Sequence, residues 1–192
     1  PYSVGLATIG SMTAESSTKD SVTADLVNAN LDVDCTFKME AIGNTSSNSE
    51  AHKAGGIGLA SGIVTKSEAK IGSGEGEKNS QTVKASINGG SVAALEDIIL
   101  RAYNAGEAVS KIMKGLEVSA VGINSTTLPT KSWYTTAANV TGGAKLNAEG
   151  DVLITSEEAT NAKSDAQGTS IGFAVSADIT KGENHIHTNN NI

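Results

Sequence analysis

The stretch Val92–Ala102, which reads Val-Ala-Ala-Leu-Glu-Asp-Ile-Ile-Leu-Arg-Ala, decides the fold because the chain repeats it. A later copy, Leu-Asn-Ala-Glu-Gly-Asp-Val-Leu-Ile-Thr-Ser, occupies Leu146–Ser156, and an earlier one, Leu-Asp-Val-Asp-Cys-Thr-Phe-Lys-Met-Glu-Ala, occupies Leu31–Ala41. Successive copies begin roughly 61 and roughly 54 residues apart, and periods of this size are typical of solenoids, propellers and other stacked arrays.

A second repeated motif, a phrase of small and apolar residues, recurs with nearly the same spacing as the first. It is clearest as Gly-Ile-Gly-Leu-Ala at Gly56–Ala60 and returns at Val4–Ala7, Val118–Gly122 and Ile171–Val175, which is the behaviour of a packing element. Its four copies follow one another at intervals of about 53, about 61 and about 53 residues, so the long spacing falls in the same place for both phrases. We therefore expect one unit to carry an insertion, and the stretch Gly72–Ser80 is its natural place.

The composition suits a narrow stack better than a compact enzyme. Only 3% of the 192 residues are aromatic, and there are 21 glycines and 2 prolines. A core fed by small and β-branched side chains favours repeat units that stack on one another. We expect a single β-solenoid segment with units at residues 1–53, 54–114, 115–168 and, in part, 169–192.

The charge of the chain limits the classes of binding partner, and its cysteine content limits the possible disulfides. The net charge of −7 and the pI near 4.9 argue against nucleic acid and anionic membranes, because both require basic patches. No apolar run is long enough to span a bilayer, and no signal peptide is visible. Cys35 is the single cysteine, so no internal disulfide is possible. Since the chain starts at Pro1 in the middle of a phrase, we interpret it as a piece of a longer protein.

Within each unit, apolar residues alternate over short stretches on both sides of an acidic corner. Alternation of this kind predicts half-buried strands joined by corners, for which Asn88–Gly90 and Gly150-Asp151 supply suitable residues. Taken alone, residues 95–116 have the spacing of an amphipathic helix, but the equivalent residues of the other units could not form one, so we predict strand. With coils of the usual short solenoid length, each unit would supply two or three coils. The predicted core residues are Leu31, Val33, Phe37, Met39, Val92, Ile98, Leu100, Leu146, Val152 and Ile154.

Together, the Gly-Ile-Gly-Leu-Ala phrase, the Thr/Ser-rich stretch after it and the phrase at Leu146–Ser156 resemble the repeats of large bacterial filamentous adhesins of the haemagglutinin and leukotoxin type. The resemblance covers residues 4 to 180. It implies a right-handed parallel β-helix, export by an outer-membrane two-partner secretion transporter that recognises a region outside this chain, and a secreted or cell-surface location. Members of this family attach bacteria to host cells, other bacteria or surfaces, and some are cytolytic.

No motif in the chain predicts a catalytic, cofactor or metal site. Gly56–Gly62 lacks the spacing and the βαβ context of a dinucleotide-binding loop. His185 and His187 are better interpreted as a solvated strand end than as metal ligands. Asp97 and Asp151 fall at corners, where a hydrogen bond is a simpler explanation than calcium.

Trp133 and Tyr134 form the one aromatic pair without a counterpart in the other units. Burial under a loop, or a cap on a corner, is the leading explanation, and an interaction site in the loop Pro129–Tyr134 is the alternative.

The sequence thus predicts a non-enzymatic shaft segment of an extracellular adhesin. Its expected partners are an unidentified surface receptor and, by end-to-end or lateral association, other copies. The alternatives are a leukotoxin-like secreted cytotoxin segment and a β-helix enzyme that acts on polysaccharides, whose site would need clustered carboxylates on one face.

Overall fold

The computed structural model describes residues 2–52, 55–113, 115–167 and 169–192. All regular secondary structure in these residues is β-strand, and every strand pairing is parallel, which confirms the prediction of an all-β chain with parallel sheets. Within residues 95–116, Ile98–Met113 forms a strand and no helix, as predicted. The described part of the chain contains no helix long and apolar enough to cross a membrane.

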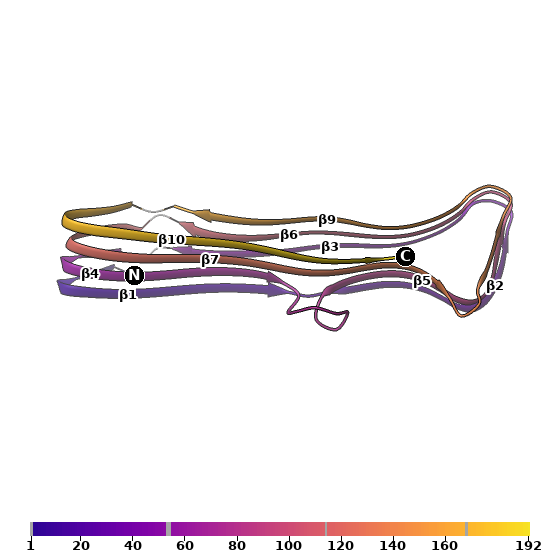
Figure 1. The fold of residues 1–192 in the computed structure, drawn as a ribbon, viewed down its shortest axis with the longest axis horizontal. Coiled ribbons are helices and arrows are strands. Elements are labelled where there is room, and N and C mark those ends of the chain that lie inside the picture. Colours follow the sequence, from indigo (N-terminus) through magenta and orange to yellow (C-terminus); the bar gives the residue numbers. More distant parts are fainter. Residues whose placement is uncertain (1, 53–54, 114, 168) are drawn as a thin grey trace.

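The chain is stacked in four layers (Figure 1). The first three layers each run along one sheet, turn, and return along a second sheet. The strands are β1 (Tyr2–Thr18), β2 (Ser21–Val33) and β3 (Phe37–His52) in layer 1; β4 (Gly55–Ile71), β5 (Gln81–Ala94) and β6 (Ile98–Met113) in layer 2; β7 (Leu116–Thr141), β8 (Lys145–Ala148) and β9 (Val152–Ala166) in layer 3; and β10 (Thr169–Asn191) in layer 4.

Two sheets result. The larger has the order β1-β4-β7-β5-β2, with β10 paired to β7 and β8 to β5, and the smaller has the order β3-β6-β9. The long β7 pairs with β4 over its first part and with β5 over its second. The predicted unit boundaries at residues 53, 54, 114 and 168 fall outside the described residues.

Ladder partners are equivalent residues of successive repeat units. Val4 pairs with Ile57 in the larger sheet. In the smaller sheet Phe37 pairs with Ile98, and Ile98 pairs in turn with Val152. One layer therefore corresponds to one repeat unit, and the expectation of two or three coils per unit is wrong. The polar stretches between the apolar phrases are part of long strands, so a single layer takes up a whole repeat unit.

The insertion, Gly72–Ser80, lies where the spacings require it. It leaves the sheet between β4 and β5 and projects from the stack (Figure 1). Gly72 and Gly76 have φ angles of 74° and 82°, which favour glycine. Main-chain bonds from Ser73 N to Asn79 O (2.6 Å) and from Ser80 N to Gly76 O (2.9 Å) close the loop.

The three complete layers turn at equivalent corners. Asn28 in layer 1, Gly89 and Gly90 in layer 2, and Gly142 and Gly143 in layer 3 all have positive φ angles. A short third side follows these corners and leads to the acidic corner before the second sheet. The part of the stack around these corners, which we call the corner end, contains the main apolar core. Its buried members are Ala41, Val83, Ala85, Ile87, Val92, Ala94, Ile98, Leu100, Ala102 and Ala138.

Most of the predicted core residues belong to this cluster. Val92, Ile98 and Leu100 are buried. The partly buried residues packed against them include Val33, Phe37, Met39, Leu146 and Ile154, whereas Leu31 is half-buried. Val152 is the exception, since it is 46% exposed. It lies in β9, the edge strand of the smaller sheet, so no strand follows it within the described residues.

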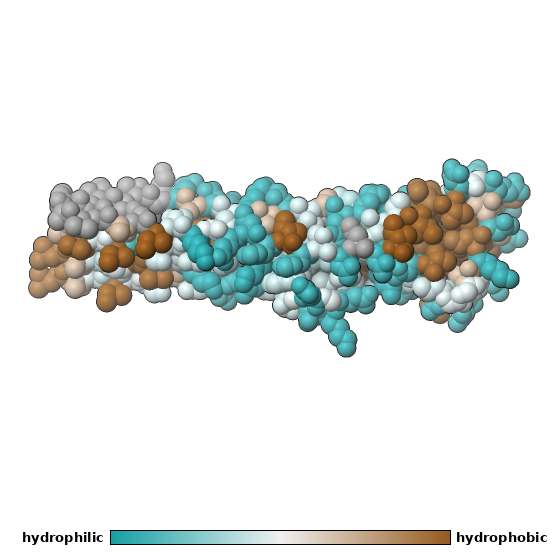
Figure 2. All heavy atoms as spheres, viewed as in Figure 1, coloured by the Kyte–Doolittle hydropathy of each residue, from teal (hydrophilic) through white to brown (hydrophobic). Residues whose placement is uncertain are grey.

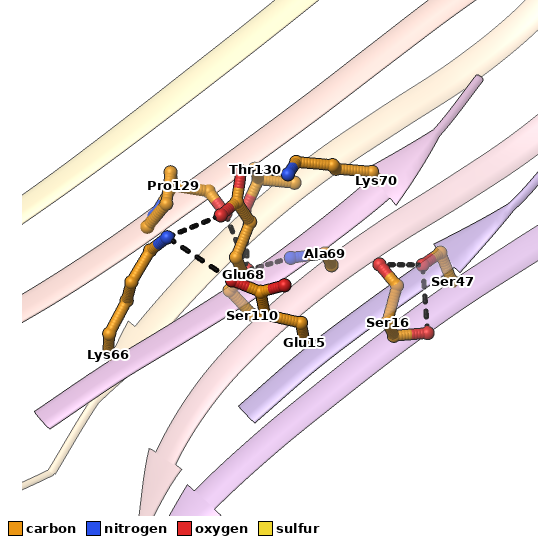
Figure 3. A network of polar contacts seen from close by, with 10 residues as sticks. All are labelled: Glu15, Ser16, Ser47, Lys66, Glu68, Ala69, Lys70, Ser110, Pro129 and Thr130. Carbon is orange, nitrogen blue, oxygen red and sulfur yellow. Dashed lines mark hydrogen bonds and ion pairs between the residues drawn. The ribbon is translucent and has the colours of Figure 1, made fainter. Parts of the chain in front are cut away.

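The remaining length of the stack, which we call the arm, is flat and filled mainly by small polar side chains. Ser67 Oγ of β4 donates to Ser49 O of β3 (2.9 Å), which joins the two sheets. Figure 3 shows similar bonds around Ser110, whose Oγ donates to Pro129 O (2.9 Å) and accepts from Ala69 N (3.0 Å). Several buried hydroxyl groups of the arm are thus satisfied across the sheets, whereas Thr65 Oγ1 and Ser132 Oγ have no such partner. The hydroxyl side chains below 5% exposure on the facing strands include Thr45, Ser47, Ser49, Thr65, Ser67, Ser110, Thr130 and Ser132.

Candidate functional site

A groove lies where the repeat is broken. Its volume is about 580 Å³, and its walls come from three layers: the insertion of layer 2, β7 of layer 3 and β10 of layer 4. The sequence marks two of these three segments as departures from the period, and the structure brings them together. The lining residues are Glu75, Gly76, Ser80, Trp133, Tyr134, Thr135, Ile186, His187, Thr188 and Asn189.

An aromatic stack forms one wall of the groove. Trp133 and His187 are ladder partners in β7 and β10, and their rings are stacked with centroids 5.9 Å apart and planes inclined by 6°. His187 is exposed near the end of β10, where a solvated strand end was expected, and its imidazole also covers the indole. Sequence reasoning could have found this pair, since Trp133 and His187 are separated by one period.

Trp133 and Tyr134 do not lie in a loop, contrary to our expectation. Both belong to the continuous strand β7, in which alternate side chains face opposite sides of the sheet. Trp133 is half-buried on the outer side, whereas Tyr134 is 2% exposed and points inward. A Cβ at Gly106 would clash with Tyr134 Oη, so the tyrosine ring requires glycine there. Of these two aromatic residues, only Trp133 is placed to contact a binding partner at the surface.

The insertion reaches along the stack from layer 1 to layer 4. Lys19 of layer 1 donates to the carbonyl oxygen of Lys78, and Glu75 Oε1 lies 4.0 Å from His187 Nδ1. At the base, Ser80 Oγ and Thr135 Oγ1 share a 2.7 Å hydrogen bond. These contacts hold the insertion beside Trp133 and define the open side of the groove.

Two acidic residues near the middle of the stack have shifted pKa values of opposite sign. Burial raises the pKa of Glu158 above its ordinary value, although Thr136 Oγ1 donates to it (2.8 Å). Burial also opposes ionisation of Glu68, but bonds from Lys66 (2.6 Å) and Lys70 (2.8 Å) outweigh it, so the pKa of Glu68 is lowered (Figure 3). Both groups are explained by local packing, and neither lines the groove.

The acidic corners hold hydrogen bonds of the expected kind. Asp97 Oδ1 accepts from the main-chain N–H of Asp151 (2.8 Å), and Thr36 Oγ1 donates to Glu96 Oε2 (2.8 Å). Among the described residues, no group of three or more His, Cys, Asp and Glu side chains is placed to hold a metal ion. Cys35 is exposed at the corner of layer 1.

The small apolar phrase is not the packing element that its recurrence suggested. Val4 is 81% exposed, Ile57 51% and Leu59 63%. Residues from the phrase in layers 1, 2 and 3 line a shallow apolar groove at the far end of the arm. Figure 2 shows this apolar region at one end of the molecule and a second at the corner end, with hydrophilic side chains between them. The side chains of the fourth copy, at residues 171–175, lie outside the described residues.

Comparison with known proteins gives no relative: no family model, no curated protein and no solved structure matches the chain.

Proposed function

We propose that this chain is a shaft segment of an extracellular bacterial filamentous adhesin, folded as a right-handed parallel β-helix. One observation carries the proposal. The spacing of ladder partners along the chain is the sequence period, so each layer offers the next an equivalent surface. An architecture in which every unit repeats the same contact with its neighbour can be extended into a long rod by adding units.

The physical role of such a shaft is to set distance. Parallel strands in adjacent layers satisfy each other's main-chain N–H and C=O groups, and the hydrogen bonds run along the stacking axis. A rod of this kind places a binding region far from the cell that exports it. Transport through an outer membrane by a two-partner system, and display at the cell surface, belong to the same proposal.

Of the alternatives, the polysaccharide-active enzyme makes the sharper geometric demand. Glycoside hydrolysis requires two carboxyl groups on either side of the scissile bond, on the order of 5 to 10 Å apart. Glu75 is the single carboxylate among the described residues that line the larger groove, and its side chain is 84% exposed. Among the described residues, this groove therefore lacks the second carboxyl group that hydrolysis requires. The cytotoxin alternative has no specific observation in its favour.

Electron microscopy of the complete exported protein tests the proposal. An antibody fragment raised against the insertion, Gly72–Ser80, would mark the position of this segment in negatively stained particles. We expect the fragment to decorate a straight, narrow rod away from its ends. Decoration of a globular head, or particles without any rod, would overturn the proposed shaft.

A further inference from the structure

We propose that the groove beside Trp133 binds a neutral or amino-bearing saccharide, with a sugar ring stacked on the indole face that points toward layer 2. The inference goes beyond the shaft role, because it assigns a ligand class to a site at which the repeat is interrupted.

In layer 2 the position beside Trp133 is taken by Gly72, whose main chain lies against Trp133 O and which carries no side chain. Ile71 pairs with Ser132 and Gln81 pairs with Tyr134, so within the described residues Trp133 has no strand partner in layer 2. On the layer 4 side the imidazole of His187 covers the indole. A ring bound on the layer 2 side would therefore extend an existing stack by one member, at a place where layer 2 has a glycine.

The chemistry of the lining matches the two kinds of surface that a sugar presents. The C–H groups on one side of a pyranose ring are apolar and pack against an aromatic face, while its hydroxyl groups need hydrogen-bond partners. Hydroxyl and amide side chains of Thr135, Thr188 and Asn189 line the groove. Its volume of about 580 Å³ lies within the range of small-molecule sites.

The charge of the groove lining determines which classes of saccharide can bind. The described residues that line the groove include Glu75 and His187 but no lysine or arginine, and the whole chain carries a net charge of −7. A sulfated or carboxylated glycan, or a nucleotide, would bring negative charge to a lining without a fixed cation to receive it. The carboxylate of Glu75 can accept a hydrogen bond from a sugar hydroxyl or pair with an ammonium group, which favours neutral and amino sugars.

Trp133 is the only tryptophan in the chain, so its fluorescence reports on this groove alone. The protein would be titrated with the trimer of N-acetylglucosamine, the trimer of glucosamine and a heparin-derived hexasaccharide. We expect saturable changes in emission with the first two and none with the third. Tighter binding of the heparin fragment, or no response to either neutral or amino trimer, would overturn the proposal.

Variants separate the site from the fold, with binding followed by calorimetry. Trp133→Ala should weaken binding of both trimers about tenfold, and Trp133→Phe should restore part of it. Glu75→Gln should weaken the glucosamine trimer more than the acetylated one. The matched control is Tyr103→Ala on the smaller sheet, where the ring packs under Arg101 at 5.0 Å; its binding should be unchanged.

Circular dichroism would confirm that each variant keeps its strand content. Binding that survives Trp133→Ala in a folded protein would also contradict the inference. Because rod shape and saccharide binding are measured separately, failure of the groove would leave the proposed shaft intact, and failure of the shaft would leave the groove intact.

Discussion

The corner end and the arm belong to the same layers but are held together by different forces. At the corner end, side chains such as Ile87, Ile98 and Leu100 are completely buried and stabilise the stack by removing apolar surface from water. In the arm, the two sheets lie close together, and short hydroxyl side chains such as Ser67 and Ser110 bond across the gap. One sequence period therefore encodes two kinds of interior, and substitutions should have different consequences in each.

The largest expected effect is at the corner end. Ile98→Asp would place a carboxylate among apolar side chains at a position that is 0% exposed, and should destabilise the fold by more than about 4 kcal/mol, enough to prevent folding. Val152→Asp, at the equivalent position one layer on, should cost less than about 1 kcal/mol because that side chain is 46% exposed. Urea denaturation of the two variants measures the difference in their free energies of unfolding. Equal losses of stability would contradict the placement of Val152 on an edge strand.

A smaller loss is expected in the arm. Ser110→Ala removes the hydroxyl that bonds Pro129 O and Ala69 N, and should cost about 1 to 3 kcal/mol because both main-chain groups are buried with it. Ser11→Ala, at an exposed position of β1, is the matched control and should be neutral. A thermal melt would decide between them. A neutral result at Ser110 would mean that the hydroxyl bonds do not hold the arm together.

The contributions of two carboxyl groups to the stability of the fold should change with pH in opposite directions. The lowered pKa of Glu68 contributes stability that is present above its ordinary pKa and lost as pH falls through its folded value. The raised pKa of Glu158 makes ionisation costly in the folded protein, so that group lowers stability as pH rises from its ordinary value through the folded one.

At pH 7 we therefore expect Glu68→Gln to be less stable than the wild type and Glu158→Gln to be more stable, each by about 1 kcal/mol or less. Both differences should shrink on acidification to pH 4. Urea midpoints at the two pH values measure this, and shifts of the same sign in both variants would refute the opposite environments.

The smallest effect is expected from restoring the period. Deleting Ser73–Ser80 would leave Gly72 between Ile71 and Gln81, as Trp133 stands between Ser132 and Tyr134 in the next layer. The change in the free energy of unfolding should stay within about 1 kcal/mol, because layer 3 passes this point without an insertion and loop length contributes little. A large loss of stability would show that the insertion supports the stack.

The repeat alignment contains the register because stacking in this fold copies the period, and the spacings located the insertion. The expectation of two or three coils per unit nevertheless did not place Phe37 beside Ile98, its equivalent in the next unit. Layer length was mispredicted because stretches such as Asn44–His52 carry few apolar residues, yet alternation of small polar side chains is what a flat, hydroxyl-filled interior requires.

Exposure and the groove were harder to predict. The Gly-Ile-Gly-Leu-Ala phrase was expected to pack inside, but apolar composition alone does not say which side of a sheet faces water, and Leu59 is exposed. The groove depends on where the insertion folds in space, which the period does not encode. Only the stacking of His187 on Trp133 carried a signal in the sequence.

The most direct test of the account is whether one layer equals one repeat unit. Nitroxide labels at Asn44 and Ala105, in a Cys35→Ser background, would occupy ladder partners on the outer face of the smaller sheet, one full period apart in the sequence. Adjacent strands are about 4.8 Å apart, so continuous-wave EPR should show strong dipolar broadening for this pair. A pair at Asn44 and Val64, much closer in the sequence, should show none, because Val64 lies on the larger sheet. Broadening of the second pair without the first would mean short coils and would contradict the four-layer stack.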